Sequence, residues 1–338
     1  MENPIYASLN SIGVYIPDHI ITNDHLSRIV ETNDAWITKR TGIKERRFAN
    51  SDEATSDLAT KAANVALQRA GLKPNEIDAV IVATISPDYF CMPSTACVVA
   101  HNLGIIGKPA LDIAAACSGF IYLLYLAKSL IESRVHKNIL IIGAEKLSSI
   151  LDMQDRSTCV LFGDGAGAAV ISATNNKEFS ILDVNCASNG EYQDFLMTPG
   201  CGARNPASPE VLQKRLQFIK MKGNETFKLA VKTLTQDVLE ILEKNNISKD
   251  EIDFFIPHQA NLRIISAVGD ALDFPKEKVA VTVQKYGNTS AASIPMAINA
   301  LYEEGKIKQG SKLLLDAFGG GLTWGSAILT FNGKPLIH

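Results

Sequence analysis

The chain has 338 residues, with 33 Lys or Arg against 36 Asp or Glu, so its formal net charge is −3. Hydrophobic residues make up 46% of the chain and charged residues 20%, which excludes collagen-like and intrinsically disordered proteins. The near-neutral charge argues against a general polyanion binder, so we expect no nucleic-acid partner. The length is enough for two domains, or for two halves that share one core.

Apolar runs rich in Val and Ile alternate with amphipathic segments, which is typical of α/β proteins. Strands are predicted at Ser8–Tyr15, Ala79–Ile85, Ile139–Ala144, Ala166–Ala173, Phe254–Ile256, Leu313–Ala317 and Ser326–Phe331. Helices are predicted at Ser56–Ala70, Gly119–Ser133, Thr226–Lys244, Leu262–Ala271 and Ser293–Glu304.

Two pairs of segments resemble each other at the same offset of 175 residues (248 − 73 and 312 − 137). The pairs are Lys73–Ile81 with Ser248–Ile256, and Lys137–Glu145 with Lys312–Gly320. We therefore predict an internal duplication, with one half over residues 1–173 and the other over 174–338; the alternative is that all α/β units look alike. Ligands of a duplicated α/β fold bind where loops of both halves meet.

Several features indicate a soluble, cytoplasmic protein. No segment approaches the roughly 18 uncharged apolar residues of a membrane span, so we expect no membrane partner. Residues Met1–Pro4 do not resemble the start of a secretion signal. The cysteines form no CxxC pair, which excludes a zinc ribbon or a dense disulfide scaffold; they are Cys91, Cys97, Cys117, Cys159, Cys186 and Cys201.

Cys117 is the first candidate catalytic residue. It follows an Ala-Ala-Ala stretch and precedes an apolar helix that we expect to be buried. The unpaired N–H groups and the dipole at the start of that helix predict a lowered pKa for the thiol. The alternative is an ordinary buried structural cysteine.

His258 and Asn288 are the second and third candidates. His258 directly follows an apolar strand that ends at Pro257, so we expect its imidazole at the strand tip, with a pKa lowered by apolar neighbours. Asn288 lies in a Gly-Asn turn before an apolar helix. Each has a structural alternative, namely a hydrogen-bonded histidine and a turn or capping asparagine.

Two glycine-rich segments carry different expectations. Gly319–Gly321 follows a predicted strand, and its backbone N–H groups are better suited to an oxyanion hole than to a phosphate, because no Walker motif is present. Gly163–Ala168 fits a dinucleotide-binding pattern, but it leads into a predicted strand where that pattern requires a helix. We therefore expect no nicotinamide cofactor.

Six motifs in the same order closely resemble the β-ketoacyl-acyl-carrier-protein synthase III family, whose members start type II fatty-acid synthesis. The motifs are Asn33–Ile43, Ala115–Phe120, Phe162–Ala169, Pro257–Ser266, Gly287–Ser293 and Ala317–Ser326. The resemblance extends over almost the whole chain. It implies a thiolase-like α/β fold, with duplicated βαβ halves in a layered αβαβα arrangement, and a homodimer.

The resemblance also implies roles for individual residues. Cys117 would be the nucleophile, His258 and Asn288 its partners, and the backbone N–H groups of Cys117 and Gly320 the oxyanion hole. The implied coenzyme A contacts are Thr32, Trp36, Arg40, Arg156, Phe227, Asn261 and Phe318, with Trp36 and Arg156 on either side of the adenine. Coenzyme A thioesters would be substrates, and neither a metal nor an organic cofactor is implied.

Docking of an acidic acyl-carrier protein would use the segment Gln259, Ala260, Asn261, Leu262 and Arg263. A local concentration of basic residues favours the same partner, although a solvated helix face is an equal alternative; these residues are Lys214, Arg215, Lys220, Lys222, Lys228 and Lys232. Met92 stands where many members have a Phe that reaches into the acyl pocket of the partner subunit. Its flexible thioether is compatible with a primer that is longer or more branched than acetyl, so the length of the primer stays open.

The expected reaction is a decarboxylative condensation of an acyl-CoA primer, with acetyl-CoA the first candidate, and malonyl-carrier protein. Its products are 3-ketoacyl-carrier protein, CoA and CO2. Three alternatives remain: a related condensing enzyme of secondary metabolism or hydroxymethylglutaryl-type chemistry, a Cys/His thioesterase, and a non-catalytic partner subunit.

Overall fold

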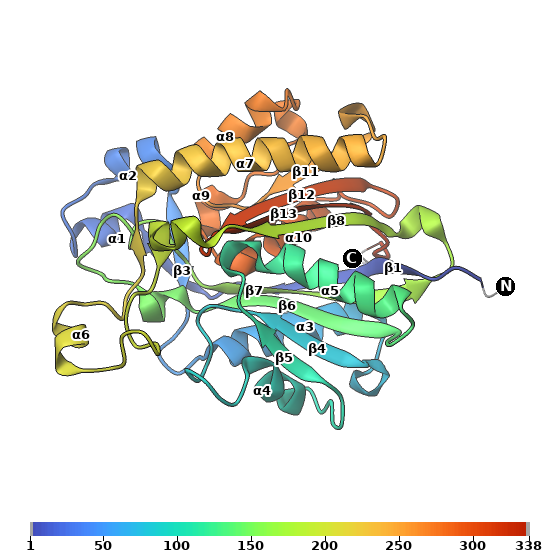
Figure 1. The fold of residues 1–338 in the computed structure, drawn as a ribbon, viewed down its shortest axis with the longest axis horizontal. Helices are drawn as coiled ribbons and strands as arrows, with labels where there is room; N and C mark the ends of the chain where they lie inside the picture. Colours follow the sequence, from blue (N-terminus) through green and yellow to red (C-terminus); the bar gives the residue numbers. More distant parts are fainter. Residues whose placement is uncertain (1–2, 336–338) are drawn as a thin grey trace.

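The computed structural model describes residues 3–335 as two mixed β-sheets with helices between and outside them (Figure 1). The first sheet has the strand order β1-β7-β6-β4-β5. Its strands are β1 (Tyr6–Tyr15), β4 (Ala79–Ala83), β5 (Ala110–Ile113), β6 (Asn138–Glu145) and β7 (Gly165–Thr174). The second sheet has the order β11-β12-β13-β8. Its strands are β8 (Ile181–Ser188), β11 (Phe254–Pro257), β12 (Lys312–Gly319) and β13 (Thr323–Thr330).

The helices complete five layers (Figure 1). Helices α5 (Gly119–Glu132) and α10 (Ser293–Glu303) lie between the two sheets. Helices α3 (Thr55–Ala70) and α4 (Thr95–Asn102) cover the outer face of the first sheet, and α7 (Gly223–Lys244) and α8 (Leu262–Ala271) cover that of the second. The smaller elements are α1 (Asn23–Ser27), α2 (Asp34–Thr41), α6 (Pro209–Gln213), α9 (Val283–Tyr286), and the strand pairs β2 (His19–Thr22) with β3 (Glu45–Phe48) and β9 (Leu196–Met197) with β10 (Lys220–Met221). No helix within the described range is long and apolar enough to span a bilayer.

The two sheets repeat one topology. From β1 to β7 and from β7 to β6 the pairing is antiparallel, and from β6 to β4 it is parallel. The second sheet has the same sequence of pairings from β8 through β13 and β12 to β11. This agreement supports the internal duplication that the sequence predicts; the boundary after residue 173 stays a prediction.

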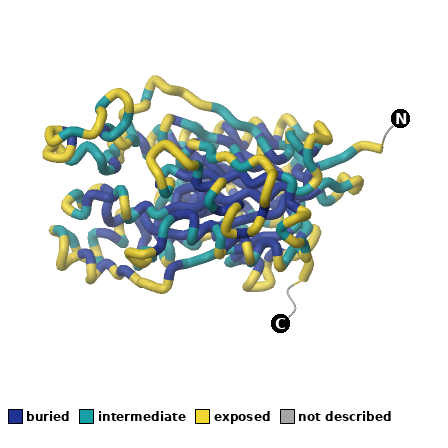
Figure 2. Tube along the Cα trace, turned by 90° about the horizontal axis from the view of Figure 1, so that it is seen from below, coloured by how far each residue is buried: buried dark blue, intermediate teal, exposed yellow. Residues whose placement is uncertain are grey.

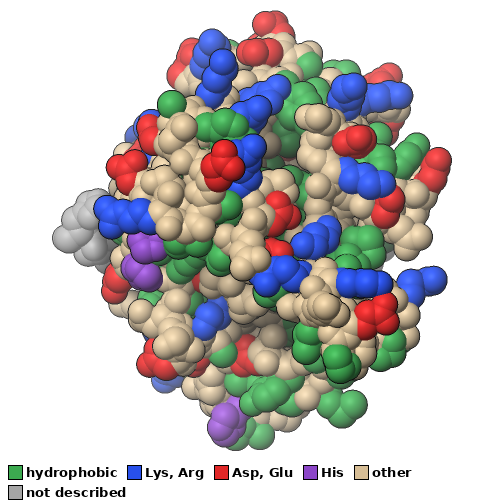
Figure 3. Space-filling model, turned by 90° about the vertical axis from the view of Figure 1, so that its left-hand side faces the viewer, with side chains coloured by type: hydrophobic (Ala, Val, Ile, Leu, Met, Phe, Trp, Pro, Cys, Tyr) green, Lys and Arg blue, Asp and Glu red, His purple; other side chains and the backbone are tan. Residues whose placement is uncertain are grey.

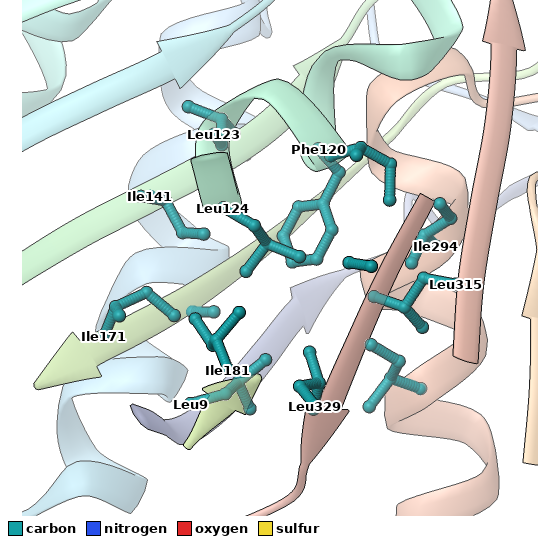
Figure 4. Packing of buried hydrophobic residues seen from close by; sticks show 14 of the residues in the cluster. Leu9, Phe120, Leu123, Leu124, Ile141, Ile171, Ile181, Ile294, Leu315 and Leu329 are labelled. Atoms are coloured by element: carbon teal, nitrogen blue, oxygen red, sulfur yellow. The ribbon is translucent and has the colours of Figure 1, made fainter. Parts of the chain in front are cut away.

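Helix α5 is apolar almost all round because it packs against both sheets. Phe120 and Leu124 are fully buried, and Figure 4 shows them among side chains such as Ile141 of β6 and Leu315 of β12. Burial of side chains of this size stabilises a fold by about 1.5–3 kcal/mol each. The buried residues form a continuous central band, while the exposed ones lie in the surrounding loops (Figure 2).

The Gly163–Ala168 segment leads into β7, as expected, and not into a helix. Its glycines have a packing function, because a Cβ atom on Gly167 would come within 2.6 Å of the Pro295 side chain in α10. The seven predicted strands are all present. Strand β8 is not among them, because its segment Ile181–Ser188 mixes polar and half-buried residues and shows no clear apolar run. It forms a strand by pairing with β13.

A buried pair of acidic residues lies between α7 and the second sheet. Asp316 of β12 is fully buried, and in the described part of the chain neither of its carboxyl oxygens has a hydrogen-bond partner. Burial raises the pKa of Asp316 well above its usual range, and the nearby Asp237 contributes. Burial also raises the pKa of Asp237 to about 6, against an opposing influence of the nearby Ser326 hydroxyl. The folded protein is therefore most stable when these two carboxyl groups are protonated.

We expect the free energy of unfolding to fall as pH rises from 5 to 8. The folded protein binds the Asp237 proton more tightly than the unfolded chain, so the stabilisation is complete at low pH and is lost as pH passes through about 6. The loss for this one group is about 1 to 2 kcal/mol. Denaturant titrations should show a flatter pH profile for Asp237→Asn, while Asp250→Asn, at an exposed position, should keep the wild-type profile. An unchanged profile in Asp237→Asn contradicts the assignment.

Candidate active site

Cys117 lies in a single turn of 3-10 helix, Ala116–Ser118, between β5 and α5. The turn is strained, since Ala116 has a φ of +45°, in the left-handed region that favours glycine. Ser118 Oγ lies 2.7 Å from the Ala115 carbonyl oxygen and 2.6 Å from Thr323 Oγ1. The Thr323 hydroxyl also donates to the Ala115 carbonyl, at 2.9 Å. Contacts from the second half of the chain thus hold the turn that carries the thiol.

The glycine segment at the end of β12 packs directly against this turn. A Cβ atom on Gly319 would lie 2.7 Å from the backbone nitrogen of Cys117, so only glycine permits this approach. Gly320 follows and lines a cavity together with Cys117. The placement is compatible with an oxyanion hole made by the N–H groups of Cys117 and Gly320, which stays a prediction.

His258 occupies the tip of β11, where its backbone N–H donates to the Asp316 carbonyl at 2.8 Å. The ring is buried, with Nδ1 2.6 Å from Ser293 Oγ. Over residues 3–335, Nε2 has no hydrogen-bond partner. Burial lowers the pKa of His258 to about 3, so the imidazole is neutral at physiological pH. This is the direction that the sequence predicts.

Asn288 is held mainly by its backbone. Its N–H donates to the Leu161 carbonyl at 2.8 Å, and its own carbonyl accepts from the Gly163 N–H at 3.0 Å. The side-chain Oδ1 accepts from the Ser290 N–H at 2.8 Å. The amide nitrogen is therefore the end of the side chain that is left for a ligand.

The three candidates meet around one narrow cavity of about 80 Å³, which Cys117, His258 and Asn288 line together with Phe318. A second cavity, of about 640 Å³, shares Cys117, Phe162 and Leu196 with the first. Cys117 therefore lies where the two cavities join. A narrow channel on one side of a nucleophile and a wider space on the other suit an extended substrate that passes its acyl end to the sulfur.

The electrostatics of Cys117 correct one prediction. Burial raises the pKa of the thiol to about 12, and the charge of Glu145 acts in the same direction. The nearby polar side chains of Ser290 and Asn288 lower it only in part. The expected lowering by the helix start is wrong for the free protein, because loss of hydration outweighs it. The resting sulfur is a thiol, and its proton must leave when the acyl group arrives.

Glu145, at the end of β6, is a site residue that the sequence analysis missed. Its carboxylate is fully buried and accepts hydrogen bonds from Ser86 Oγ at 2.6 Å and from the Ile85 N–H at 3.1 Å. Burial raises its pKa to about 7. The signal in the sequence that could have identified Glu145 is its position as an acidic residue at the end of an apolar strand.

The fold and the site agree with comparisons to known proteins. Residues 111–190 match the family 3-oxoacyl-[acyl-carrier-protein (ACP)] synthase III, and residues 242–331 match its C-terminal part. The β-ketoacyl-[acyl-carrier-protein] synthase III of Aliarcobacter butzleri is 61% identical over 327 residues, 97% of this chain and 98% of the relative. That of Campylobacter curvus is 63% identical over 329 residues, with 97% and 98% covered. The crystal structure of the Aquifex aeolicus 3-oxoacyl-[acyl-carrier-protein] synthase III, 47% identical, covers 96% of this chain and is itself covered completely, with a TM-score of 0.89.

This chain belongs to the β-ketoacyl-[acyl-carrier-protein] synthase III family. It is a thiolase-fold condensing enzyme, an acyltransferase of fatty-acid biosynthesis, which confirms the resemblance and the fold class that the motifs predict.

For the synthase, only some of the residues expected to hold coenzyme A line the narrow cavity. Phe227, Asn261 and Phe318 line the narrow cavity, and the Asn261 side chain caps α8 by accepting from the Ile264 N–H at 3.0 Å. Thr32 does not line that cavity. Its buried hydroxyl has no hydrogen-bond partner among the described residues. The positions of Phe227, Asn261 and Phe318 are compatible with a pantetheine path, which stays a prediction.

Trp36, Arg40 and Arg156 form a separate cluster. The guanidinium carbons of Arg40 and Arg156 lie 4.3 and 5.0 Å from the Trp36 ring centroid, and Arg156 donates to the Glu31 carbonyl at 2.9 Å. Arg156 already packs on the indole, and an aromatic base between the two needs about 7 Å of separation, because each of its faces requires a contact distance of about 3.5 Å. An adenine can enter between them only if Arg156 moves outward.

The predicted carrier-protein segment is only partly accessible. Gln259 is 1% exposed, and its side chain bonds to backbone groups of Pro257, Ala280 and Thr282. The expectation that Gln259 contacts the carrier protein is therefore wrong, because its amide is used to join β11 to the segment before α9. Arg263 is exposed and its guanidinium lies 5.0 Å from the Phe227 ring centroid.

Four of the six predicted basic residues form ion pairs within the chain, and three carboxylates serve all four. Lys214 pairs with Glu210, Arg215 and Lys220 with Asp152, and Lys222 with Asp194. On the end of the molecule that carries α2 and α6, basic and acidic side chains are interspersed (Figure 3). No such ion pair is found in residues 3–335 for Lys228, Lys232 or Arg263, so these carry the remaining positive field.

Met92 does not line either cavity of its own chain. It is 80% exposed, next to the likewise exposed Phe90, which does line the wider cavity. A contact between Met92 and the acyl pocket of a second subunit stays a prediction.

Proposed function

We propose that this synthase joins an acyl-CoA primer, acetyl-CoA first among the candidates, to malonyl-carrier protein with Cys117, His258 and Asn288 as its catalytic residues. The observation that carries the proposal is their convergence on one narrow cavity that opens beside Cys117 into a wider one. Two halves of the chain contribute to it, as the duplicated fold requires.

In the first half-reaction, Cys117 Sγ attacks the thioester carbonyl of the acyl-CoA. The new bond joins Sγ to the acyl carbon, the bond from that carbon to the CoA sulfur breaks, and the thiol proton ends on the released CoA. The N–H groups of Cys117 and Gly320 hold the developing oxyanion. A donor of this kind is worth about 2.7–4 kcal/mol of transition-state stabilisation.

In the second half-reaction, the malonyl thioester carbonyl binds between His258 and Asn288. Its carboxylate leaves as CO2, and hydrogen bonds from His258 Nε2 and the Asn288 amide nitrogen stabilise the enolate. This carbanion forms a bond to the acyl carbon on Cys117, and the bond from that carbon to Sγ breaks. The sulfur leaves as a thiolate and takes up one proton from solvent, which restores the thiol. A neutral imidazole suits the step, because decarboxylation requires a donor and no base.

The test follows both substrates in one assay. We expect CoA release from acetyl-CoA and loss of malonyl-carrier protein in equal amounts, with formation of a 3-ketoacyl product. Continuous CoA release without a malonyl acceptor would instead indicate a thioesterase. A product formed with a different acceptor would indicate a related condensing enzyme, and absence of both reactions a non-catalytic subunit.

We also propose docking of an acidic carrier protein around Arg263, where α8 and α7 border a shallow groove next to the narrow cavity. Arg263→Glu should raise the KM for malonyl-carrier protein about tenfold at low salt and leave acylation by acetyl-CoA unchanged, because steering acts on the charged partner. Lys214→Glu is the matched control, since that side chain already pairs with Glu210. Equal effects of the two variants in steady-state kinetics contradict docking at Arg263.

A homodimer completes the proposal. Strand β5 is the free edge of the first sheet, and its Leu111 side chain is exposed. Large apolar side chains are also exposed on the loop between β4 and α4, including Tyr89 and Phe90. Such edges and patches are usually covered in solution. Light scattering should give twice the chain mass; a monomer contradicts the proposal and the predicted contact of Met92.

A further inference from the structure

The two ring nitrogens of His258 have different surroundings. Nδ1 lies 2.6 Å from Ser293 Oγ, at the start of α10. Nε2 is buried and has no partner within the described range 3–335, and the ring lines the narrow cavity. A neutral imidazole carries one proton, so one nitrogen donates and the other accepts. Which nitrogen holds the proton decides whether His258 can donate a hydrogen bond into the cavity.

The hydrogen atoms around Ser293 decide between the two forms. Its Oγ accepts from the backbone N–H of Gln259 at 3.3 Å, and no third partner for this oxygen is found in residues 3–335. If Nδ1 carried the proton, Oγ would accept twice and its own buried hydrogen would have no acceptor. If the hydroxyl donates to Nδ1, the serine hydrogen and the Gln259 N–H are both satisfied, and only the Nε2 hydrogen is left, on the ring that lines the cavity. Burial makes this the lower-energy arrangement, because it leaves the smaller number of polar groups unpaired.

We propose that Ser293 is a positioning residue that donates to His258 Nδ1 and so holds the neutral imidazole with its proton on Nε2, directed at the substrate carbonyl. The proposal deepens the function given above and rests on it, because that function requires a donor at Nε2 when the malonyl group loses CO2. The backbone supports the same geometry, since the His258 N–H is held by Asp316 and the Gln259 N–H by Ser293.

Nitrogen-15 NMR of protein labelled in the histidine rings tests the tautomer directly. We expect the His258 signals, assigned by their loss in His258→Asn, to show a protonated Nε2 and an unprotonated, hydrogen-bonded Nδ1. In Ser293→Ala, the Nδ1 resonance should move to the position of a nitrogen that accepts no hydrogen bond. A wild-type spectrum with the proton on Nδ1 overturns the proposal, whether or not any variant folds.

Kinetics of the separated half-reactions provide the second readout. Ser293→Ala should lower the condensation rate about 10- to 100-fold, while the rate of acyl-enzyme formation from acetyl-CoA stays within about twofold. Ser293→Thr, which keeps a hydroxyl, should recover most of the loss. Equal losses in both steps, or no rescue by Thr, indicate a purely structural serine and contradict the proposal. If His258→Ala condenses normally while the spectra are as expected, the catalytic role of His258 fails and the tautomer assignment stands.

Discussion

Replacement of Cys117 by serine is expected to abolish acyl transfer. After incubation with acetyl-CoA, the intact mass of the wild-type protein should increase by one acetyl group, and Cys117→Ser should show no increase. Overall turnover should fall by at least roughly 10³-fold, because an alkoxide is far harder to form than a thiolate and the residue acts as a covalent carrier. The buried position makes the effect specific, since Cys117 lies where the two cavities join.

The matched control is Cys97→Ser. Cys97 is an exposed cysteine on α4, so this variant tests adventitious acylation of a surface thiol. It should retain both the adduct and the turnover. An unmodified wild-type protein, or an adduct that persists in Cys117→Ser, contradicts the nucleophile assignment.

Replacement of His258 by alanine is expected to separate the two half-reactions. Acyl-enzyme should still form on Cys117, because no step of acylation uses the His258 proton. Condensation should fall by roughly 10³-fold or more, since the enolate loses a preorganised donor in a narrow, buried cavity. Rapid-quench measurements of acyl-enzyme formation and of 3-ketoacyl product in single turnovers distinguish the two steps.

His258→Asn serves as the companion variant, because an amide nitrogen can still donate a hydrogen bond and should restore part of the condensation rate. The wild-type condensation step should also show no fall between pH 8 and pH 5 from imidazole protonation, because burial lowers the pKa of His258 to about 3. If the imidazole acted as a base with its ordinary pKa of about 6.5, the rate would decrease about tenfold per pH unit below that value. Loss of acylation in His258→Ala, or such a decrease, would show that His258 acts as a base.

The predictions from the sequence agree best with the structure for features that depend on a single short segment of the chain. The strand before His258 and the apolar helix after Cys117 were predictable, because each is a continuous apolar run. The residues that follow each run in the sequence mark where the element stops. The doubled topology was predictable from two segment pairs, Lys73–Ile81 with Ser248–Ile256 and Lys137–Glu145 with Lys312–Gly320. The motifs around Cys117, His258 and Asn288 were likewise enough to identify the family.

Charge and burial were harder to predict. Arg215, Lys220 and Lys222 looked like part of a docking field, but their acidic partners Asp152 and Asp194 are up to 68 positions away in sequence and only the fold brings them together. Gln259 shares a motif with Arg263, yet its side chain is turned inward to backbone groups. Sequence neighbours on a loop can face opposite ways, and composition does not report which.

By itself, the sequence determined the family, the two-sheet α/β architecture and the three side chains proposed to carry the chemistry, because these depend on local runs and motifs. Only the tertiary structure decided the state of those side chains. The thiol of Cys117 is protonated, the ring of His258 is neutral and Ser293 touches its Nδ1, since hydration, charge and hydrogen bonding depend on groups that are distant in sequence and meet only when the two halves pack together.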